Sequence, residues 1–247
     1  MKANGIFFDL DNTLFDYDRA FGLAAMQSFS EMYGERMIVG CTKVNIELDW
    51  FIIFKTYCDH FWAGYECGDL SRTAYQNKRF ITSLQACGLQ AGSHRAAAVF
   101  EERLRTYIPS YCKLYAGVSQ ILQELCDRKM LMGIITNGEK TVQRNKIEAL
   151  NLTNWIKPQH VFISDEMNVQ KPNPAIFEKI QEKTDCSNPL YVGDSWDQDI
   201  FPATVSGWKA VWLTTRRSEP KTQGSHLEYR RAASVSELNQ LLISYIE

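Results

Sequence analysis

The chain has 247 residues, 45% of them hydrophobic and 23% charged, which is typical of a globular protein with a sizeable core. A formal net charge of −2 gives no basic field that would attract a nucleic acid polymer or an anionic membrane. No stretch approaches the ~20 apolar residues that a membrane-spanning helix needs. Asp9 ends the first apolar run too early for a secretory signal, and the seven cysteines are scattered without a Cys-x-x-Cys pair, so we expect reduced thiols and a cytoplasmic location.

The first predicted strand, at 6–8, runs straight into two aspartates, Asp9 and Asp11. Short apolar runs bounded by polar residues are typical of buried strands, and ligands of open α/β sheets bind beyond the carboxyl ends of their strands. Residues two apart in extended chain point the same way, so both carboxylates can face one pocket, where their repulsion favours a bound cation such as Mg²⁺. An Asp-x-Asp sequence also serves as a helix cap or a turn, and the motif alone leaves both interpretations open.

Helices and no convincing strand are predicted for the next part of the chain, at 19–33, 47–65, 71–87 and 95–107. A helical block between a first strand and later α/β units indicates an inserted cap domain, 17–108. Trp62, Tyr65 and Arg79 in this block are candidates for stacking on a base or meeting a second anion. The alternative is that this aromatic helical face packs inside a four-helix bundle, as such faces usually do.

Strands and helices alternate over the rest of the chain. We predict strands at 131–135, 161–163, 190–192 and 210–213, and helices at 117–129, 141–150, 175–184, 197–207 and 235–246. The strand at 210–213 is expected to close the sheet, and the polar segment 215–229 is expected to form a surface loop. The alternation predicts an α/β fold: a three-layer α/β/α, Rossmann-like core with a parallel sheet, formed by residues 1–16 and 109–247.

Polar residues follow three of the predicted strands. Thr136 and Asn137 follow one of them and offer a hydroxyl and backbone N–H groups to a phosphate oxygen. Asp194 follows another, with Asp199 one helical turn further on, and Lys171 supplies a cation from a loop. Each residue has an ordinary alternative role as a turn, a cap or a solvated lysine. Their joint occurrence with the two N-terminal aspartates favours a site for phosphoryl transfer, which needs a nucleophile, a metal and charge neutralisation.

Four motifs, in order, resemble those of the haloacid dehalogenase (HAD) superfamily. They are 8–14 (FDLDNTL), Thr136, 170–174 (QKPNP) and 193–199 (GDSWDQD). The helical insertion between the first two is similar to the superfamily's helical (C1) cap. The segments 136–138 (TNG) and 164–166 (SDE), with the Lys171 loop, resemble the 5′-nucleotidase subgroup. One departure is Asn168, where relatives often carry Gly, but Asn tolerates the same left-handed conformation.

The resemblance implies a Mg²⁺-dependent phosphatase acting on a small phosphorylated metabolite, such as a nucleoside 5′-monophosphate. By that resemblance, Asp9 attacks phosphorus to form an aspartyl-phosphate, while Asp11 protonates the leaving oxygen and then activates the hydrolytic water. The carboxylates of Asp9 and Asp194 and the main-chain carbonyl of Asp11 would hold Mg²⁺. Lys171 would bridge the nucleophile and the phosphate, and Asp199 would orient Lys171 or a metal-bound water.

Three other functions stay open at this level. A phosphosugar mutase would share the core and differ in excluding water from the intermediate, which the sequence does not reveal. A haloacid dehalogenase is less favoured, because dehalogenases of this superfamily lack the second acid of the first motif, present here as Asp11. A catalytically silent binding protein would have lost the nucleophile or a metal ligand, and neither is lost. Oligomeric state leaves no mark in the sequence.

Overall fold

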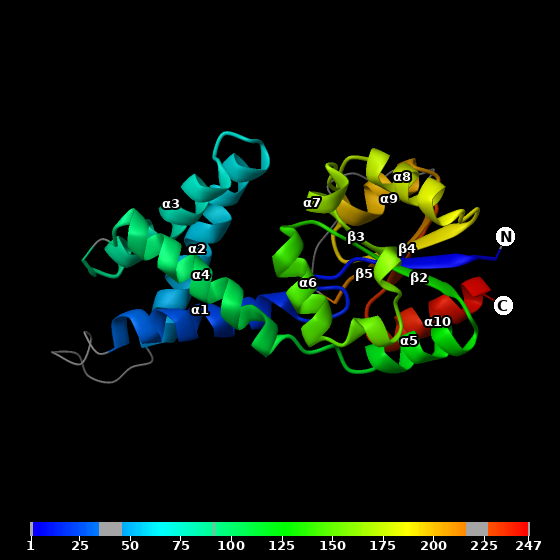
Figure 1. Ribbon diagram of the computed structural model, residues 1–247, viewed down its shortest axis with the longest axis horizontal. Helices are drawn as coiled ribbons and strands as arrows, with labels where there is room; N and C mark the ends of the chain where they lie inside the picture. The colour runs from blue at the N-terminus through cyan, green and yellow to red at the C-terminus, as the bar shows by residue number, and fades with distance from the viewer. Residues whose placement is uncertain (1, 35–45, 91, 216–226, 247) are drawn as a thin grey trace. The chain divides into compact units, whose positions relative to one another are not determined.

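The computed structural model describes residues 2–34, 46–90, 92–215 and 227–246 (Figure 1). The chain divides into two compact units. The core unit comprises Met1–Tyr17 and Cys112–Glu247, and the helical unit comprises Asp18–Tyr111. The sequence-based boundary lies at 108/109, but the last helix of the helical unit contains Pro109 and continues to Tyr111. A proline near a helix end removes one N–H without breaking the turns before it.

The core unit is built on a parallel sheet, which in the described residues has six strands in the order β3-β2-β1-β4-β5-β6. The strands are β1 (Gly5–Phe8), β2 (Leu131–Thr136), β3 (Val161–Ile163), β4 (Pro189–Gly193), β5 (Lys209–Leu213) and β6 (Tyr229–Ala232). Every residue of β1 and β4 is buried, as a parallel sheet covered on both faces requires. Phe8 lies opposite Ile134 and Val192, so the residues that follow β1, β2 and β4 emerge at the same edge.

The sheet does not close at β5, and this sequence-based prediction was wrong. Tyr229–Ala232 forms β6, parallel to β5, with Arg230 opposite Val211. Only Ala232 of this strand is buried, so the strand lacks the apolar run that identified the others. Charged residues are common on edge strands because they discourage pairing with other chains. Of the predicted loop 215–229, the segment 216–226 lies outside the described residues.

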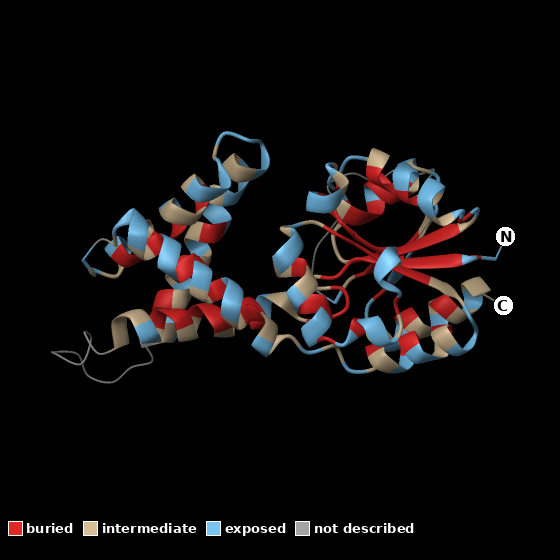
Figure 2. Cartoon of the chain, viewed as in Figure 1, coloured by how far each residue is buried: buried red, intermediate tan, exposed pale blue. Residues whose placement is uncertain are grey.

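Helices cover both faces of this sheet. Figure 1 shows α8 (Ala175–Thr184) and α9 (Phe201–Val205) on one side, and α5 (Val118–Asp127) and α10 (Val235–Ile246) on the other. Strands β1, β3 and β4 are buried along their whole length (Figure 2). Two further helices, α6 (Lys140–Ala149) and α7 (Ser164–Met167), follow β2 and β3. Asn168, which ends α7, has a φ of 52°, so asparagine does take the left-handed conformation here.

The helical unit contains, in its described residues, the helices α1 (Tyr17–Tyr33), α2 (Ile46–Glu66), α3 (Arg72–Ala86) and α4 (His94–Tyr111). Aromatic rings from all four form its core: Trp50 stacks on Phe29 with ring centroids 4.1 Å apart, and Phe80 stacks on Phe100 at 4.4 Å. Ser71 caps α3, and its side chain accepts a hydrogen bond from the backbone N–H of Ala74. The predicted fold class, a three-layer core with an inserted helical bundle, is confirmed.

The insertion leaves and rejoins the core unit through one backbone junction. Phe15 pairs in antiparallel fashion with Leu114, and the N–H of Tyr115 donates to the carbonyl oxygen of Leu14 at 3.0 Å. These residues flank the two points where the units meet in sequence, Tyr17–Asp18 and Tyr111–Cys112. The two connecting segments are therefore held together by hydrogen bonds that belong to the core unit.

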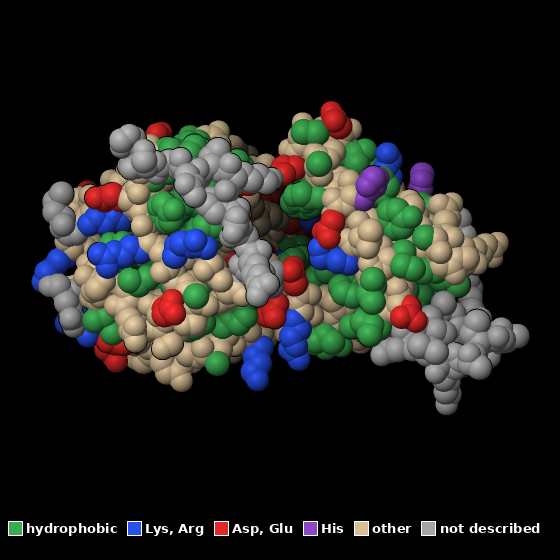
Figure 3. Space-filling view, turned by 180° about the vertical axis from the view of Figure 1, so that it is seen from behind, with side chains coloured by type: hydrophobic (Ala, Val, Ile, Leu, Met, Phe, Trp, Pro, Cys, Tyr) green, Lys and Arg blue, Asp and Glu red, His purple; other side chains and the backbone are tan. Residues whose placement is uncertain are grey.

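The surface carries charges of both signs. On the face drawn in Figure 3, lysine and arginine side chains are interspersed with aspartate and glutamate, in line with the net charge of −2. None of the helices in the described part of the chain combines the length and the apolar character needed to cross a membrane.

A buried ion pair lies inside the helical unit. Arg79 and Glu101 are 7% and 4% exposed, and Nη2 of Arg79 lies 2.6 and 2.8 Å from the two carboxylate oxygens of Glu101. Removing Glu101 leaves the buried charge of Arg79 without its partner. Glu101→Leu is therefore expected to lower the free energy of unfolding by about 3–5 kcal/mol. The double variant Arg79→Met/Glu101→Leu is expected to recover most of this loss, because it leaves no unpaired charge.

Urea denaturation followed by circular dichroism measures both effects. Glu102→Leu, at the neighbouring exposed position, is the matched control and should change stability little. A double variant no more stable than Glu101→Leu would show that the ion pair is not the cause.

Candidate active site

Three carboxylates lie close together at the C-terminal ends of the parallel strands. Asp9 directly follows β1, is 6% exposed, and its backbone N–H donates to the Val192 carbonyl oxygen at 2.8 Å. Asp194 follows the last residue of β4, and Asp199 lies in the short helical turn Trp196–Ile200. Carboxylate oxygens of Asp9, Asp194 and Asp199 all lie within 4.8 Å of one another. The structure thus brings these three sequence-predicted residues together, and we call them the carboxylate cluster.

Asp199 depends on a glycine at position 193. Its carboxylate is 1% exposed and accepts a hydrogen bond from the Ser195 backbone N–H at 3.0 Å. A Cβ atom on Gly193 would lie only 2.5 Å from Cβ of Asp199, so any larger residue would push the aspartate away. The glycine of the fourth motif therefore allows the close approach of Asp199 to the end of β4.

Lys171 forms ion pairs with two members of the carboxylate cluster. Its Nζ donates to Oδ1 of Asp9 at 2.7 Å, to Oδ1 of Asp199 at 2.6 Å and to the hydroxyl of Tyr191 at 2.8 Å. Burial alone would lower the pKa of Lys171, but the two carboxylates outweigh it and raise the pKa above its ordinary value. An ammonium group has three N–H donors, and these contacts use all three. The contact to the predicted nucleophile is present, while a contact to phosphate would require one of these bonds to be exchanged.

Tyr191 is a member of this network that the sequence did not reveal. Its ring packs edge-on against Phe177 in the core of the unit, with ring centroids 5.1 Å apart. Its hydroxyl lies 3.1 Å from Oδ1 of Asp199 and 3.2 Å from the Ile135 carbonyl oxygen, either of which can accept its proton. Burial, reinforced by the nearby aspartates, raises the pKa of Tyr191 well above its ordinary value, so the phenol stays neutral. A tyrosine inside an otherwise apolar buried strand is the signal that could have identified it.

The environment of Asp9 disfavours its charge when no cation other than Lys171 is near. Burial raises the pKa of Asp9 to about 7; the carboxylates of Asp199 and Asp11 add to this effect, and Lys171 opposes it. An added divalent cation would favour the ionised carboxylate. The carboxylate cluster supplies the oxygen donors that such a hard cation prefers, so the residues present fit Mg²⁺.

Thr136 and Asn137 lie at the end of β2, next to this cluster in the sheet order. The side chain of Asn137 donates to the Lys171 carbonyl oxygen at 2.8 Å and accepts from the Lys171 N–H at 3.0 Å. This pair of bonds fixes the Lys171 loop, a role that the sequence did not suggest. The groups predicted to contact phosphate are the Thr136 hydroxyl and the backbone N–H of Asn137. Neither takes part in these two hydrogen bonds.

Asp11, the predicted acid and base, is held by two residues that sequence reasoning also missed. Lys146 contributes an ion pair to Asp11 and Gln143 a hydrogen bond, and both residues come from α6. Their spacing of three residues on the helix after Thr136 places them on one face, but the sequence gives no reason to bury that face.

The remaining candidates, Trp62, Tyr65 and Arg79, lie in the helical unit. Trp62 is 48% exposed and contacts the ring of Tyr65 edge-on at 5.4 Å. Tyr65 stacks on Tyr75 at 5.2 Å, and the guanidinium of Arg79 is engaged by Glu101. Trp62 is thus the member of the three with the most open surface, and a substrate contact by any of them stays a prediction.

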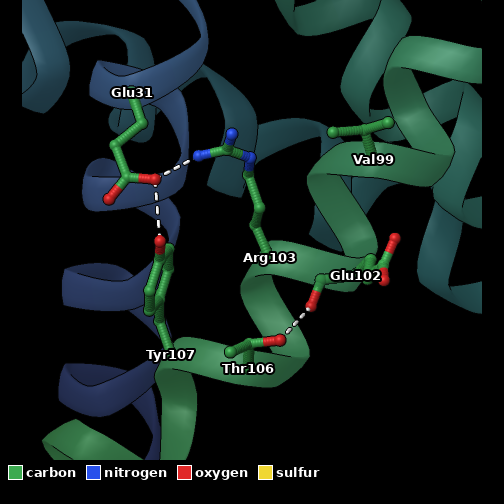
Figure 4. Close-up of a pocket in the computed structure, with 6 residues that line it drawn as sticks. All are labelled: Glu31, Val99, Glu102, Arg103, Thr106 and Tyr107. Atoms are coloured by element: carbon green, nitrogen blue, oxygen red, sulfur yellow. Dashed lines mark hydrogen bonds and ion pairs between the residues drawn. The ribbon is translucent and has the colours of Figure 1, made fainter.

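A surface hollow in the helical unit contains none of these candidates. Its lining residues, drawn in Figure 4, are Glu31, Val99, Glu102, Arg103, Thr106 and Tyr107. Tyr107 donates to Oε2 of Glu31 at 2.7 Å, and Arg103 pairs with the same carboxylate. The charges of Glu31 and Arg103 are therefore satisfied by each other.

A model of the family described as haloacid dehalogenase-like hydrolase matches residues 41–213 of this chain. The chain belongs to this family. Among its relatives, pyrimidine 5′-nucleotidase YjjG of Escherichia coli (strain K12) is 27% identical, covering 99% of this chain and 100% of that protein. Glyceraldehyde 3-phosphate phosphatase of Pyrococcus abyssi (strain GE5 / Orsay) is 29% identical, covering 84% and 80%.

Among solved structures, the HAD-hydrolase YfnB from Bacillus subtilis has the same fold. It superposes with a TM-score of 0.78 at 23% identity, covering 98% of this chain and 99% of that one. The family predicted from the four motifs and the fold predicted from the alternation of strands and helices are confirmed, and the protein is a HAD-like hydrolase.

Proposed function

We propose that this protein is a Mg²⁺-dependent phosphatase that hydrolyses small phosphomonoesters through an aspartyl-phosphate intermediate. The observation that carries the proposal is the carboxylate cluster, in which Asp9 is buried and held by Lys171 at 2.7 Å. Family membership supports hydrolysis, and the named activities of the relatives support a phosphorylated substrate. The substrate proposed first is a nucleoside 5′-monophosphate of the cytoplasm, in line with the nucleotidase relative.

In the first step, a carboxylate oxygen of Asp9 bonds to phosphorus while the bond from phosphorus to the ester oxygen breaks. Lys171 orients that carboxylate and offsets its charge, and Asp199 and Tyr191 fix Lys171 in turn. Asp11 gives a proton to the leaving oxygen, so that an alcohol departs. The Thr136 hydroxyl and the Asn137 backbone N–H would donate hydrogen bonds to the phosphate oxygens.

In the second step, Asp11 takes a proton from water, which attacks the phosphorus of the aspartyl-phosphate and releases inorganic phosphate. The carboxylates of Asp9 and Asp194 and the main-chain carbonyl of Asp11 would hold Mg²⁺. The ion, when bound, offsets negative charge on the phosphate oxygens in both steps.

A panel of phosphomonoesters tests this function. Purified protein with Mg²⁺ is incubated with nucleoside 5′-monophosphates, sugar phosphates, glyceraldehyde 3-phosphate and 4-nitrophenyl phosphate, and inorganic phosphate is measured. We expect release from 4-nitrophenyl phosphate and a clear preference for one natural class. No release from any ester would overturn the proposal, and an isomeric phosphate in place of free phosphate would identify a mutase.

The same panel tests the candidates in the helical unit. Trp62→Ala removes the most exposed of these side chains without touching the Arg79–Glu101 pair. If Trp62 contacts the organic part of the substrate, KM for the preferred ester rises while KM for 4-nitrophenyl phosphate changes little. An unchanged KM for the preferred ester would contradict such a contact.

A further inference from the structure

We propose that Lys146 and Gln143 are positioning residues for Asp11, an inference that rests on the proposed function. Nζ of Lys146 lies 2.9 Å from both carboxylate oxygens of Asp11. Nε2 of Gln143 lies 3.1 Å from Oδ2 of the same carboxylate. Both oxygens are therefore bound by donors from one helix, and we call Lys146 and Gln143 the Asp11 clamp.

The clamp is buried, although α6 is a polar helix. Lys146 is 3% exposed and Gln143 is 1% exposed, whereas Asp11 is still 26% exposed. Lysine is almost never fully buried unless it is paired, because removing its charge from water is costly. The clamp thus holds a buried positive charge against Asp11, whose own side chain stays partly exposed.

Lys146 is fixed from a second direction by an aromatic ring. Its Nζ lies 4.3 Å from the centroid of the Tyr17 ring, a cation–π contact. The ammonium is therefore enclosed between the Asp11 carboxylate and the face of Tyr17. A lysine fixed on both sides orients its partner more strictly than a solvated lysine, whose flexible stem would let the carboxylate turn.

Gln143 links Asp11 to the predicted phosphate site. Its Nε2 also donates to Oγ1 of Thr136, so one amide group binds both the acid and the threonine. Because Thr136 accepts this bond through its oxygen, its hydroxyl proton remains available as a donor. One side chain therefore connects the carboxylate of Asp11 with the hydroxyl of Thr136.

This geometry matters for the transfer of a proton to the leaving oxygen. A general acid must lie within hydrogen-bond reach of the atom it protonates, and the clamp fixes where Asp11 stands relative to the phosphate contacts. An alkyl ester depends on this proton because an alkoxide leaves poorly. A 4-nitrophenyl ester does not, because nitrophenolate is stable without it. Loss of the Asp11 clamp is therefore expected to lower kcat/KM much more for alkyl esters than for the 4-nitrophenyl ester.

The test compares kcat/KM of Lys146→Met and Gln143→Leu on two esters, the preferred alkyl phosphate from the panel and 4-nitrophenyl phosphate. We expect Lys146→Met to lose about 100-fold on the alkyl ester, within the range of general acid catalysis, and only a few-fold on the aryl ester. Asp11→Asn should show the same split, and the double variant Lys146→Met/Asp11→Asn should be no worse than Asp11→Asn. Lys146→Arg should restore part of the alkyl activity.

Equal losses on both esters, or losses that multiply in the double variant, would reduce the clamp to a structural role and overturn the inference. Lys140→Met, at an exposed lysine of the same helix, is the control and should match wild type. If Lys146→Met does not fold, Gln143→Leu and Lys146→Arg carry the same comparison. Wild-type protein that hydrolyses neither ester would instead overturn the proposed function itself.

Discussion

Replacing Asp9 with asparagine is expected to lower kcat by ~10⁴-fold or more, the range seen when a catalytic nucleophile or its activating partners are removed. The neutral amide of asparagine is a far weaker nucleophile than a carboxylate, because its nitrogen lone pair is delocalised and its oxygen carries no full negative charge, so the covalent intermediate is not expected to form. The variant is expected to fold, because Lys171 keeps Asp199 and Tyr191 as partners at 2.6 and 2.8 Å. Phosphate release under saturating substrate measures the loss.

Trapping the intermediate separates this mechanism from direct attack by water. Wild-type protein is quenched with acid during turnover of an ester that carries a radioactive label in its phosphoryl group. It should retain label on the chain, and Asp9→Asn should retain none. Asp197→Asn is the matched control, since Asp197 is exposed and lies between Asp194 and Asp199 in sequence. Label on Asp9→Asn, or near-normal turnover by it, would contradict a covalent role for this residue.

Removal of divalent ions with EDTA is expected to lower the activity by at least ~100-fold, and excess Mg²⁺ should restore it. Without a cation, the carboxylate cluster repels the anionic substrate. Asp194→Asn should raise the Mg²⁺ concentration needed for half-maximal activity by about tenfold or more, because it weakens one oxygen ligand. Full turnover in excess EDTA would rule out the metal requirement.

The affinity for Mg²⁺ should depend on pH through Asp9. Its pKa is raised to about 7 by burial, so in chelator-treated protein at lower pH the carboxyl is mostly protonated and a proton competes with the ion. Affinity should therefore rise with pH up to about 7 and level off above it, with a proton released per ion bound in the lower range. Calorimetry in two buffers of different ionisation enthalpy measures this release. Affinity that is flat from about pH 5.5 to about pH 8 would contradict the assignment.

The sequence predicted those parts of the fold that carry strong local signals. The apolar runs of β1, β2 and β4 lie in the centre of a parallel sheet, where strands are buried on both faces. Because the carboxyl ends of such strands share one edge, the positions of Asp9 and Asp194 followed from the strand assignments alone. The edge strand β6 escaped prediction because two of its four residues are exposed arginines.

The partners of the predicted site residues could not be found in the same way. Lys146 lies in a polar amphipathic helix, where a lysine normally faces water, and its burial is explained by tertiary contacts with Asp11 and the Tyr17 ring. Tyr191 is a polar residue within an apolar strand, but nothing in the sequence places its hydroxyl beside Lys171. Asn137 appears in the sequence as a turn residue. Its side chain is hydrogen-bonded to the backbone of Lys171, which lies 34 positions further along the chain.

The junction formed by Phe15 and Leu114 makes the architecture modular. Because backbone pairing within the core unit already joins the two ends of the insertion, a recombination event could exchange the whole bundle as a cassette. Every residue of the carboxylate cluster, Lys171 and the Asp11 clamp lie outside that cassette. The helical unit could thus be exchanged in evolution while the residues proposed for catalysis in the core unit stay unchanged.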